Sequence, residues 1–392
     1  MRILFALMAL NAAAAMPISF YAVGLPVLLR ETGVPLEIIG FTALVYLPFT
    51  FAFAWAPYVD RSKPLGFPRR RFWMAATLLP MGVFTLLGAS LAPASQTAAV
   101  LVLAFVISIG AATLRTTILG LTIESFDGAN RTWAAALVPA GGALGALIGA
   151  TGLLLVYGAV GWAGAMIAMA AILLLLLGPG LMLPEASHER PVPGTIGALR
   201  SFFCDAENRQ TLTFIAPLAL GLGLGFGMMQ PRLVDLGYSV EEIGLINGVF
   251  TCIALFTGGP LAAAGIRRFG LARMIPVGLS VVTAALIYAA LVSALAWPRL
   301  HAAASVATFF LAFSFIGVMT NLMFMNRSNP GREGTDFSIF LCAYWFFTMI
   351  GMIGSGFIAS SFGYAAAFGG GAIIAASAGL LIHRLRLVVQ AA

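Results

Sequence analysis

The sequence predicts an all-α membrane protein of twelve transmembrane helices, arranged as two pseudosymmetric six-helix bundles. Three observations support this prediction: the composition, the placement of the basic residues, and a motif that occurs once in each half of the chain. Of the 392 residues, 61% are hydrophobic and only 9% are charged, whereas a soluble domain carries about 25% charged residues. So few charges cannot cover a water-facing surface, and the excess apolar area must therefore face lipid.

Hydropathy divides the chain into segments long enough to cross a bilayer, since each crossing needs ~20 apolar residues. The polar stretch 184–209 contains several prolines and charges of both signs, and we expect it to be a cytoplasmic linker. It separates an N-terminal bundle at 1–183 from a C-terminal bundle at 210–392. The predicted spans are 3–25, 37–59, 72–92, 97–122, 133–157, 161–183, 210–229, 241–264, 271–294, 301–325, 336–360 and 363–383.

The basic residues fall in alternate loops. Of the 21 Lys and Arg residues, only Arg30, Arg232 and Arg299 are placed in loops of the opposite side, and Arg115 lies inside a span. Basic loops remain in the cytoplasm, so both termini are predicted to be cytoplasmic and the number of spans to be even. The apolar run after Arg2 exceeds the roughly 7–15 residues of a signal-peptide core, which favours a retained first helix. We therefore expect a multi-pass protein of the bacterial inner membrane.

A spaced motif near the first outer loop occurs again in the second half of the chain. Its members Leu29, Gly33, Glu37, Ile39 and Gly40 recur with the same spacing as Leu233, Gly237, Glu241, Ile243 and Gly244. The first glycine of each set suits a turn that needs positive φ, and the acid suits the first turn of a helix. Duplication of a six-helix unit explains the repeat; the alternative is a common turn-to-helix solution used twice.

Some classes of function are excluded by what the sequence lacks. Lys63 is the single lysine and no Gly-Lys-Ser/Thr follows a glycine-rich loop, so the chain cannot bind ATP in a P-loop. The three His and three Cys lack the spacing of metal ligands or of a disulfide framework. The net charge of +7 is distributed between spans and does not indicate nucleic-acid binding. We therefore expect no enzymatic activity, no cofactor and no metal, and transport driven by a solute or ion gradient.

Three short stretches carry a resemblance to a known family. The first span ends in Gly24-Leu25-Pro26, the second ends in Trp55 to Arg61, and the loop before the eleventh reads Gly331 to Ser338. Together with the twelve-span layout, these stretches resemble the AmpG-type branch of the major facilitator superfamily, and within it the RhtX/FptX-type siderophore-uptake permeases. The resemblance implies two bundles that rock around a midplane solute site. It also implies a small-molecule substrate, with protons as the candidate coupling ion.

Arg115 is predicted to lie within the fourth span, where the AmpG-type branch often carries an acid. A charge at membrane depth costs at least ~2.5 kcal/mol, so the side chain should face the bundle interior or a wet cavity. One interpretation is that its planar guanidinium binds a carboxylate of the substrate. The alternatives are an ion pair with Glu124 and snorkelling to the inner surface.

Glu124 and three further charged residues are candidates for gating or coupling. Asp60 and Arg61 end the second span and are predicted to form part of an inner gate, whereas the positive-inside rule alone explains the cluster 69–71. Asp336 opens the eleventh span, where the helix dipole stabilises an acid. The alternative for Asp336 is a proton site or a gate partner.

Several polar and aromatic residues inside spans are candidates for lining the substrate path. Such side chains prefer the bundle interior, although Asn and Gln often only link neighbouring helices, contributing about 0.6 kcal/mol each. Aromatic residues can stack on a ring-bearing ligand but also occur at membrane interfaces. The candidates are Asn11, Tyr21, Gln230, Asn247, Asn321, Tyr344 and Trp345.

Together these observations predict a secondary active transporter that works by alternating access. The expected substrate is a siderophore or related organic acid moved across the inner membrane, as the resemblance implies. The alternatives are an exporter of drugs or metabolites with the same fold, a muropeptide-type permease, and a membrane sensor that does not transport.

Overall fold

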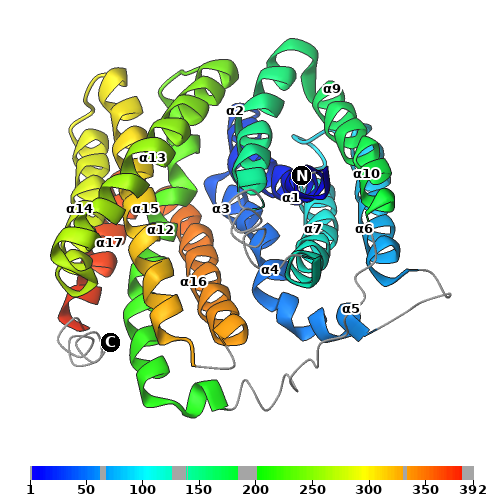
Figure 1. Cartoon of the computed structure of the whole chain (residues 1–392). Coiled ribbons are helices and arrows are strands. Elements are labelled where there is room, and N and C mark those ends of the chain that lie inside the picture. Colours follow the sequence, from blue (N-terminus) through cyan, green and yellow to red (C-terminus); the bar gives the residue numbers. More distant parts are fainter. Residues whose placement is uncertain are drawn as a thin grey trace. The chain divides into compact units, whose positions relative to one another are not determined.

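The computed structural model describes most of the chain, and the regular structure of the described residues is helical (Figure 1). Within the described residues, eleven helices are long and apolar enough to cross a membrane. One of them, Ala140–Met182, is 43 residues long and contains a non-helical residue, Gly161, with φ 72°. A crossing needs ~20 residues, so this segment supplies two, and the predicted twelve-span helical fold is confirmed. The described residues are 2–61, 68–125, 138, 140–183, 201–329 and 333–381.

The chain forms two compact units. Unit 1 comprises Met1–Thr32 and Leu44–Thr195, and unit 2 comprises Gly33–Ala43 and Ile196–Ala392. The short segment Gly33–Ala43 thus belongs by its contacts to the unit formed mainly by the C-terminal half. The sequence-based boundaries of the two bundles and of the linker stay predictions, since most of the linker lies outside the described residues.

Unit 1 contains spans with irregular helical segments. The first span begins with α1 (Arg2–Ser19), passes through the π-helix η1 (Phe20–Gly24) and ends with α2 (Leu25–Glu31). Pro48 near the start of α4 lacks a backbone N–H, and two 3₁₀ segments interrupt the second span. The remaining elements are η2 (Phe41–Tyr46), α4 (Leu47–Phe51), η3 (Ala52–Ala54), α5 (Ala56–Arg61), α6 (Arg69–Gly88), α7 (Thr97–Ser125), the helix at 140–147, η5 (Ile148–Gly152), α9 (Leu153–Leu175) and α10 (Leu177–Met182).

Unit 2 is built from longer, more continuous helices. In it α12 packs against α16 and α17, α13 against α15, and α14 against α15 and α17. The helix α3 (Leu36–Gly40) at the start of the second span also packs on α16 in this unit. The bounds are α12 (Ala206–Asp235), α13 (Val240–Phe269), α14 (Leu271–Ala294), α15 (Arg299–Arg327), α16 (Glu333–Phe362), α17 (Tyr364–Ser377) and η6 (Ala378–Leu381).

Glycines allow α1 and the fifth span to touch through their backbones in unit 1. A Cβ atom added at Gly141, Gly145 or Gly149 would lie 2.0–2.2 Å from a carbonyl oxygen of α1. No side chain fits at such a distance, so the four-residue glycine spacing is a packing surface, as small residues are in other membrane helix pairs. Beyond this row of glycines, the two π-helices η1 and η5 are in contact with each other.

The repeated motif adopts the same structure in both halves. Gly33 and Gly237 have φ of 82° and 77°, and each precedes the helix that follows the turn. The apolar members of both copies are buried, with Leu29 and Leu233 at 0% and 1% exposure. A second pair of positive-φ glycines, Gly161 and Gly363, precedes the last span of each half. Two matching turns in each half support duplication over independent use of one turn.

Candidate functional site

Arg115 lies within α7 of unit 1, and its side chain is exposed. Its guanidinium carbon lies 5.9 Å from the ring centroid of Phe49, which comes from α4 in the interrupted second span. Nearby on the same two spans, Trp55 Nε1 donates a hydrogen bond of 3.0 Å to Thr113 Oγ1. We call Phe49, Trp55, Thr113 and Arg115 the Arg115 cluster.

The threonines beside Arg115 are bonded to their own helix. The hydroxyls of Thr113, Thr116 and Thr117 each donate to the carbonyl oxygen four residues earlier in α7, at 2.8–3.0 Å. Their hydrogen-bonding capacity is therefore partly used by the backbone. The guanidinium is the cationic group of the cluster, and it lies beside the ring of Phe49. An exposed cation on an aromatic face gains about 0.5–1 kcal/mol from that ring.

The three arginines 69–71 at the start of α6 lie in different environments, which the positive-inside rule alone does not explain. Arg69 and Arg70 are buried, with 8% and 2% exposure. A Cβ atom at Gly120 of α7 would lie 2.5 Å from the Arg70 guanidinium, so Arg70 packs directly on that helix. Arg71 instead donates from Nε to the carbonyl oxygen of Leu183 at 2.8 Å. Three consecutive arginines look alike in the sequence, but a helix turns about 100° per residue and directs each one differently.

Gln230 of α12 and Asn247 of α13 are buried in unit 2, at 4% and 1% exposure. Oε1 of Gln230 and both amide atoms of Asn247 have no hydrogen-bond partner within the described part of the chain. A buried polar group without a partner costs about 1–3 kcal/mol, so each such group calls for an explanation. These two amides are therefore among the unit 2 groups able to meet a polar ligand or an ordered water.

The remaining candidates of unit 2 lie in or beside an aromatic group. Tyr344 is buried, and its ring lies 5.5 Å from that of Trp345 and 6.5 Å from that of Phe324. Trp345 is half-buried, and Asn321 is exposed while donating to the carbonyl oxygen of Gly317 at 2.9 Å. The structure thus places Tyr344 in the packed interior and leaves Asn321 and Trp345 partly accessible.

Asn11 and Tyr21 take part in packing within unit 1. Asn11 Nδ2 donates to the carbonyl oxygen of Val138 at 2.6 Å and so links the first and fifth spans. Tyr21 lies in the π-helix η1, is fully buried, and its hydroxyl lies 3.9 Å from the sulfur of Met166. Both placements favour interhelical packing over contact with a substrate.

Asp336 is fully buried near the start of α16. Its Oδ2 accepts hydrogen bonds from the backbone N and the side-chain Nδ2 of Asn329, at 3.0 and 2.8 Å, while Oδ1 has no partner among the described groups. The carboxylate thus ties the end of α15 to α16. The side chains of the other gating candidates, Asp60, Arg61 and Glu124, lie outside the described residues.

Arg232 was expected in an outer loop but lies inside α12, where it is 4% exposed. This helix continues to Asp235, beyond the predicted end at residue 229. The Arg232 guanidinium donates to Ser305 Oγ at 3.2 Å and lies 5.6 Å from the Phe368 ring centroid. The loop placement is therefore wrong: Arg232 is a buried link between α12, α15 and α17. Pro231 makes the sequence suggest that the helix ends earlier. In a membrane helix, however, neighbouring helices satisfy the backbone groups that a proline leaves free, so the helix can continue past it.

The apolar helical spans define a multi-pass membrane protein. The chain belongs to the Major Facilitator Superfamily, whose sequence profile matches residues 7–344. The nucleoside transporter NupG has a TM-score of 0.72 to this structure at 14% identity, covering 99% of both chains. A D-xylose–proton symporter has a TM-score of 0.72 at 14% identity, covering 98% of this chain and 96% of its own. At these identities the likeness shows the fold alone.

Sequence relatives support the AmpG-like branch of this superfamily. The anhydromuropeptide permease of Escherichia coli is 28% identical over 276 residues, covering 68% of this chain. The alignment covers 56% of that permease, so the chain spans little more than half of its length. A putative transporter AmpG 4 of Rickettsia felis is 24% identical over 271 residues, covering 65% of this chain and 66% of its own. The similarity to siderophore permeases stays a prediction.

Proposed function

We propose that this protein is a secondary active transporter that imports a small organic acid by alternating access. The observation that carries the proposal is Arg115, an exposed cation within a membrane span and beside the Phe49 ring. A charge facing hydrocarbon costs at least ~2.5 kcal/mol, so an arginine in this position faces a wet path or an anion. Its planar fork of N–H groups matches the two oxygens of a carboxylate.

The aromatic members of the Arg115 cluster suit a substrate that is both anionic and ring-bearing. Phe49 offers a ring beside the guanidinium, and Trp55 is held by its bond to Thr113. A siderophore or related organic acid has this combination, and it is the favoured substrate class. The Oε1 atom of Gln230 and the amide of Asn247, which have no hydrogen-bond partner among the described residues of unit 2, are suited to polar groups of the same solute.

The second candidate substrate is a muropeptide. It is favoured by the 28% identity to the anhydromuropeptide permease of Escherichia coli, and a muropeptide also bears carboxylates that Arg115 could bind. Proton coupling belongs to both versions of the proposal. Asp336 is its candidate residue, since it is a buried carboxylate with one oxygen without a described partner.

The decisive experiment is uptake by the purified protein in proteoliposomes with an imposed proton gradient. Saturable uptake of an iron-labelled siderophore supports the favoured substrate, and saturable uptake of a labelled anhydromuropeptide supports the second. If neither substrate is taken up and cells lacking the gene accumulate more of a toxic compound, the protein is an exporter and not an importer. Absence of saturable flux for all substrates in both directions would contradict transport and favour a sensor.

A further inference from the structure

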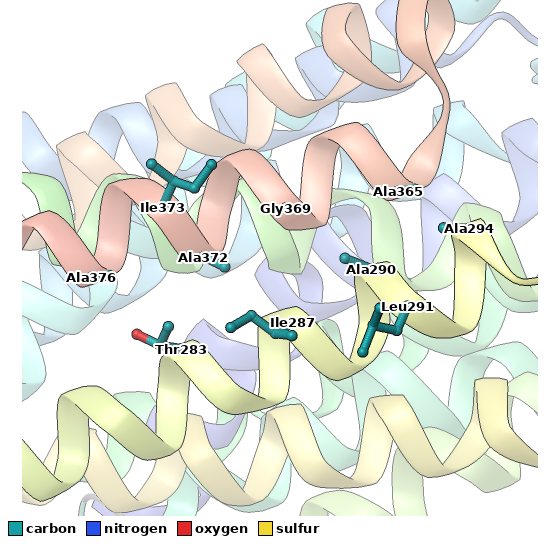
Figure 2. Close-up of a pocket in the computed structure, with 10 residues that line it drawn as sticks. All are labelled: Thr283, Ile287, Ala290, Leu291, Ala294, Ala365, Gly369, Ala372, Ile373 and Ala376. Atoms are coloured by element: carbon teal, nitrogen blue, oxygen red, sulfur yellow. The ribbon is translucent and has the colours of Figure 1, made fainter.

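Two charged groups of unit 2 are buried apart from its apolar groove. That groove, between α14 and α17, has a volume of about 420 Å³ and is lined mainly by alanine and aliphatic side chains (Figure 2). The residues described as lining it include no charged side chain, so its walls offer nothing that binds a proton. The two charged groups are instead Arg327, at the end of α15, and Asp336, near the start of α16.

Arg327 is the last residue of α15, and its guanidinium engages one of its two terminal nitrogens. Nη1 forms an ion pair with Oε2 of Glu207 in the first turn of α12. Nη2 is buried and has no hydrogen-bond partner in the described part of the chain. The Arg327 side chain is 8% exposed, whereas that of Glu207 is 63% exposed. A largely buried cation is thus paired with a carboxylate that water also reaches.

Asp336 supplies the complementary group nearby. Its Oδ2 accepts two hydrogen bonds from Asn329, and its buried Oδ1 has no partner among the described groups. Asn329 follows Arg327 by two positions in the chain. Because consecutive Cα atoms are about 3.8 Å apart, the Cα atom of Arg327 lies within about 8 Å of that of Asn329. The long arginine side chain can therefore reach the carboxyl group that Asn329 binds directly.

The observed pairing of Arg327 indicates the protonation state of Asp336. A charge left buried without a counter-ion is strongly destabilising, whereas an ion pair with an exposed carboxylate contributes little. An ionised Asp336 would therefore draw the nearby guanidinium away from Glu207. The guanidinium remains on Glu207, as expected when Asp336 is protonated and neutral. The proton belongs on Oδ1, because Oδ2 already accepts two hydrogen bonds.

Other titratable or charged groups lie at the starts of α12 and α16. They are Cys204, Asp205, Arg209, Arg332 and Glu333. Arg332 and the side chain of Glu333 lie outside the described residues. Asp205 caps α12 and attracts Arg327 through space, and Arg209 donates to two backbone carbonyl oxygens. Among the described cations at this end of unit 2, Arg327 therefore has the nitrogen that is available to Asp336.

We propose that Arg327 switches between Glu207 and Asp336 as a proton binds to and leaves Asp336. With Asp336 protonated, Arg327 holds Glu207 and ties the end of α15 to the start of α12. When Oδ1 releases its proton to water, the guanidinium turns to the new carboxylate and the tie to α12 is broken. The switch converts protonation of one buried side chain into a rearrangement of helix ends. Its part in proton-coupled transport rests on the proposed function, but its test uses no substrate.

The test is an infrared titration of the purified full-length protein without substrate. Difference spectra between pH values follow the C=O stretching band of protonated carboxylic acids, and the part that is lost in Asp336→Asn is assigned to Asp336. The two test variants are Glu207→Gln and Arg327→Gln. The matched control is Glu242→Gln, because Glu242 forms another ion pair of unit 2, with Arg299, and its side chain is 53% exposed.

The wild type should show the Asp336 band near neutral pH and lose it as the pH rises. Glu207→Gln frees the guanidinium for Asp336, so the midpoint of the titration should fall by at least about one pH unit, a tenfold weaker proton affinity. Arg327→Gln removes the cation and should raise the midpoint by a similar amount. Glu242→Gln should leave the midpoint where the wild type has it.

Three results would overturn the switch: no Asp336 band at any pH, midpoints equal to that of the wild type, or shifts of both test variants in the same direction. If Arg327→Gln fails to fold, Glu207→Gln against Glu242→Gln decides alone, since both replace exposed carboxylates. Opposite shifts in a protein without proton-driven uptake would support the switch and contradict proton coupling. Proton-driven uptake with unshifted midpoints would support coupling and contradict the switch.

Discussion

Arginine residues in this chain occupy very different environments. Arg115 is exposed inside a span, Arg70 is buried against Gly120, and Arg232 is buried against Ser305 and Phe368. The sequence distinguishes loop from span, but it does not indicate which helix face each side chain occupies. The free energy of a buried arginine depends on that face, because burying a cation is tolerated only beside groups that accept its N–H bonds.

The first residue-scale prediction concerns Arg115. Arg115→Ala should raise the concentration of an anionic substrate that gives half-maximal uptake, because the cation that binds the carboxylate is lost. Arg115→Lys should keep part of the uptake, because lysine retains the charge but not the bidentate geometry. Loss of one charge-assisted hydrogen-bonding group is worth about 1.5–3 kcal/mol, roughly 10- to 100-fold in affinity. The measurement is initial uptake rate against substrate concentration in proteoliposomes.

The matched control for this prediction is Arg71→Ala. Arg71, at the start of α6 in the same unit, donates to the backbone carbonyl of Leu183 at the end of α10 and is not a member of the Arg115 cluster. The Arg71→Ala variant should lower the free energy of unfolding more than it lowers the affinity for substrate. Normal uptake in Arg115→Ala, or equal losses in both variants, would contradict a binding role for Arg115.

The second residue-scale prediction concerns the buried carboxylate of Asp336. Asp336→Ala removes the acceptor of two hydrogen bonds from Asn329 and should lower the free energy of unfolding by about 1–3 kcal/mol. Asp336→Asn keeps one oxygen acceptor, so its free energy of unfolding should fall by less than that of Asp336→Ala. Thermal unfolding followed in detergent checks the order. If the Asn variant folds like the wild type but loses concentrative uptake, the carboxylate itself takes part in transport.

The candidate site was predictable only in part. Arg115 stands out in the sequence because a charge within an apolar span is rare. The sequence offers no comparable signal for Phe49, whose ring lies beside it from a short helix between two 3₁₀ segments of the second span. Asn11 and Tyr21 have the same polarity as true lining residues, and only their contacts place them in the packing between helices.

Close backbone contact is the main feature at the scale of the elements. The glycine stripe of the fifth span lies on carbonyl oxygens of α1, and both helices then continue as π-helices that touch. A π-helix adds a residue to a turn, and such bulges are frequent at functional sites. In unit 2 the short helix α3 contacts α16 similarly, because a Cβ atom at Gly356 would lie 2.4 Å from the carbonyl oxygen of Leu36.

The element-scale prediction compares two glycines of the fifth span. A Cβ atom at Gly145 would lie 2.2 Å from the Ala12 carbonyl oxygen, whereas at Gly152 its nearest neighbour is a methyl carbon at 3.8 Å. Gly145→Ala should therefore lower the free energy of unfolding by about 1–3 kcal/mol through overpacking. Gly152→Ala should stay within about 0.5 kcal/mol of the wild type. Thermal unfolding in detergent measures both, and equal midpoints would contradict the close contact.

At the scale of the whole molecule, the arrangement of arginines predicts the orientation in the membrane. Both termini are expected in the cytoplasm because basic loops stay on that side. In a background with Cys204, Cys252 and Cys342 replaced by serine, Ser95→Cys should react with a membrane-impermeant maleimide from outside intact cells. Asn326→Cys, near the end of α15, should react only after the cells are opened. The reverse pattern, or reaction of both from one side, would contradict this topology.

The sequence by itself determined that lipid surrounds most of this protein and how many spans it has, and it predicts that the two halves arose by duplication. These features follow from composition and from spacing along the chain, which are local properties: twenty apolar residues must span lipid as a helix wherever they pack. The positive φ of Gly33 and Gly237 is likewise predicted by their position in a repeated turn.

Only the tertiary structure decided which polar residues are buried together and where a hollow remains. Arg70 lies on Gly120, and small residues of α14 and α17 leave a groove between them. Among the described residues, Gln230 Oε1 and the Asn247 amide are buried without a hydrogen-bond partner. Each of these depends on the rotation of one helix against another. That rotation is set by side-chain fit across a contact between segments far apart in the chain, and hydropathy along a single segment carries no information about it.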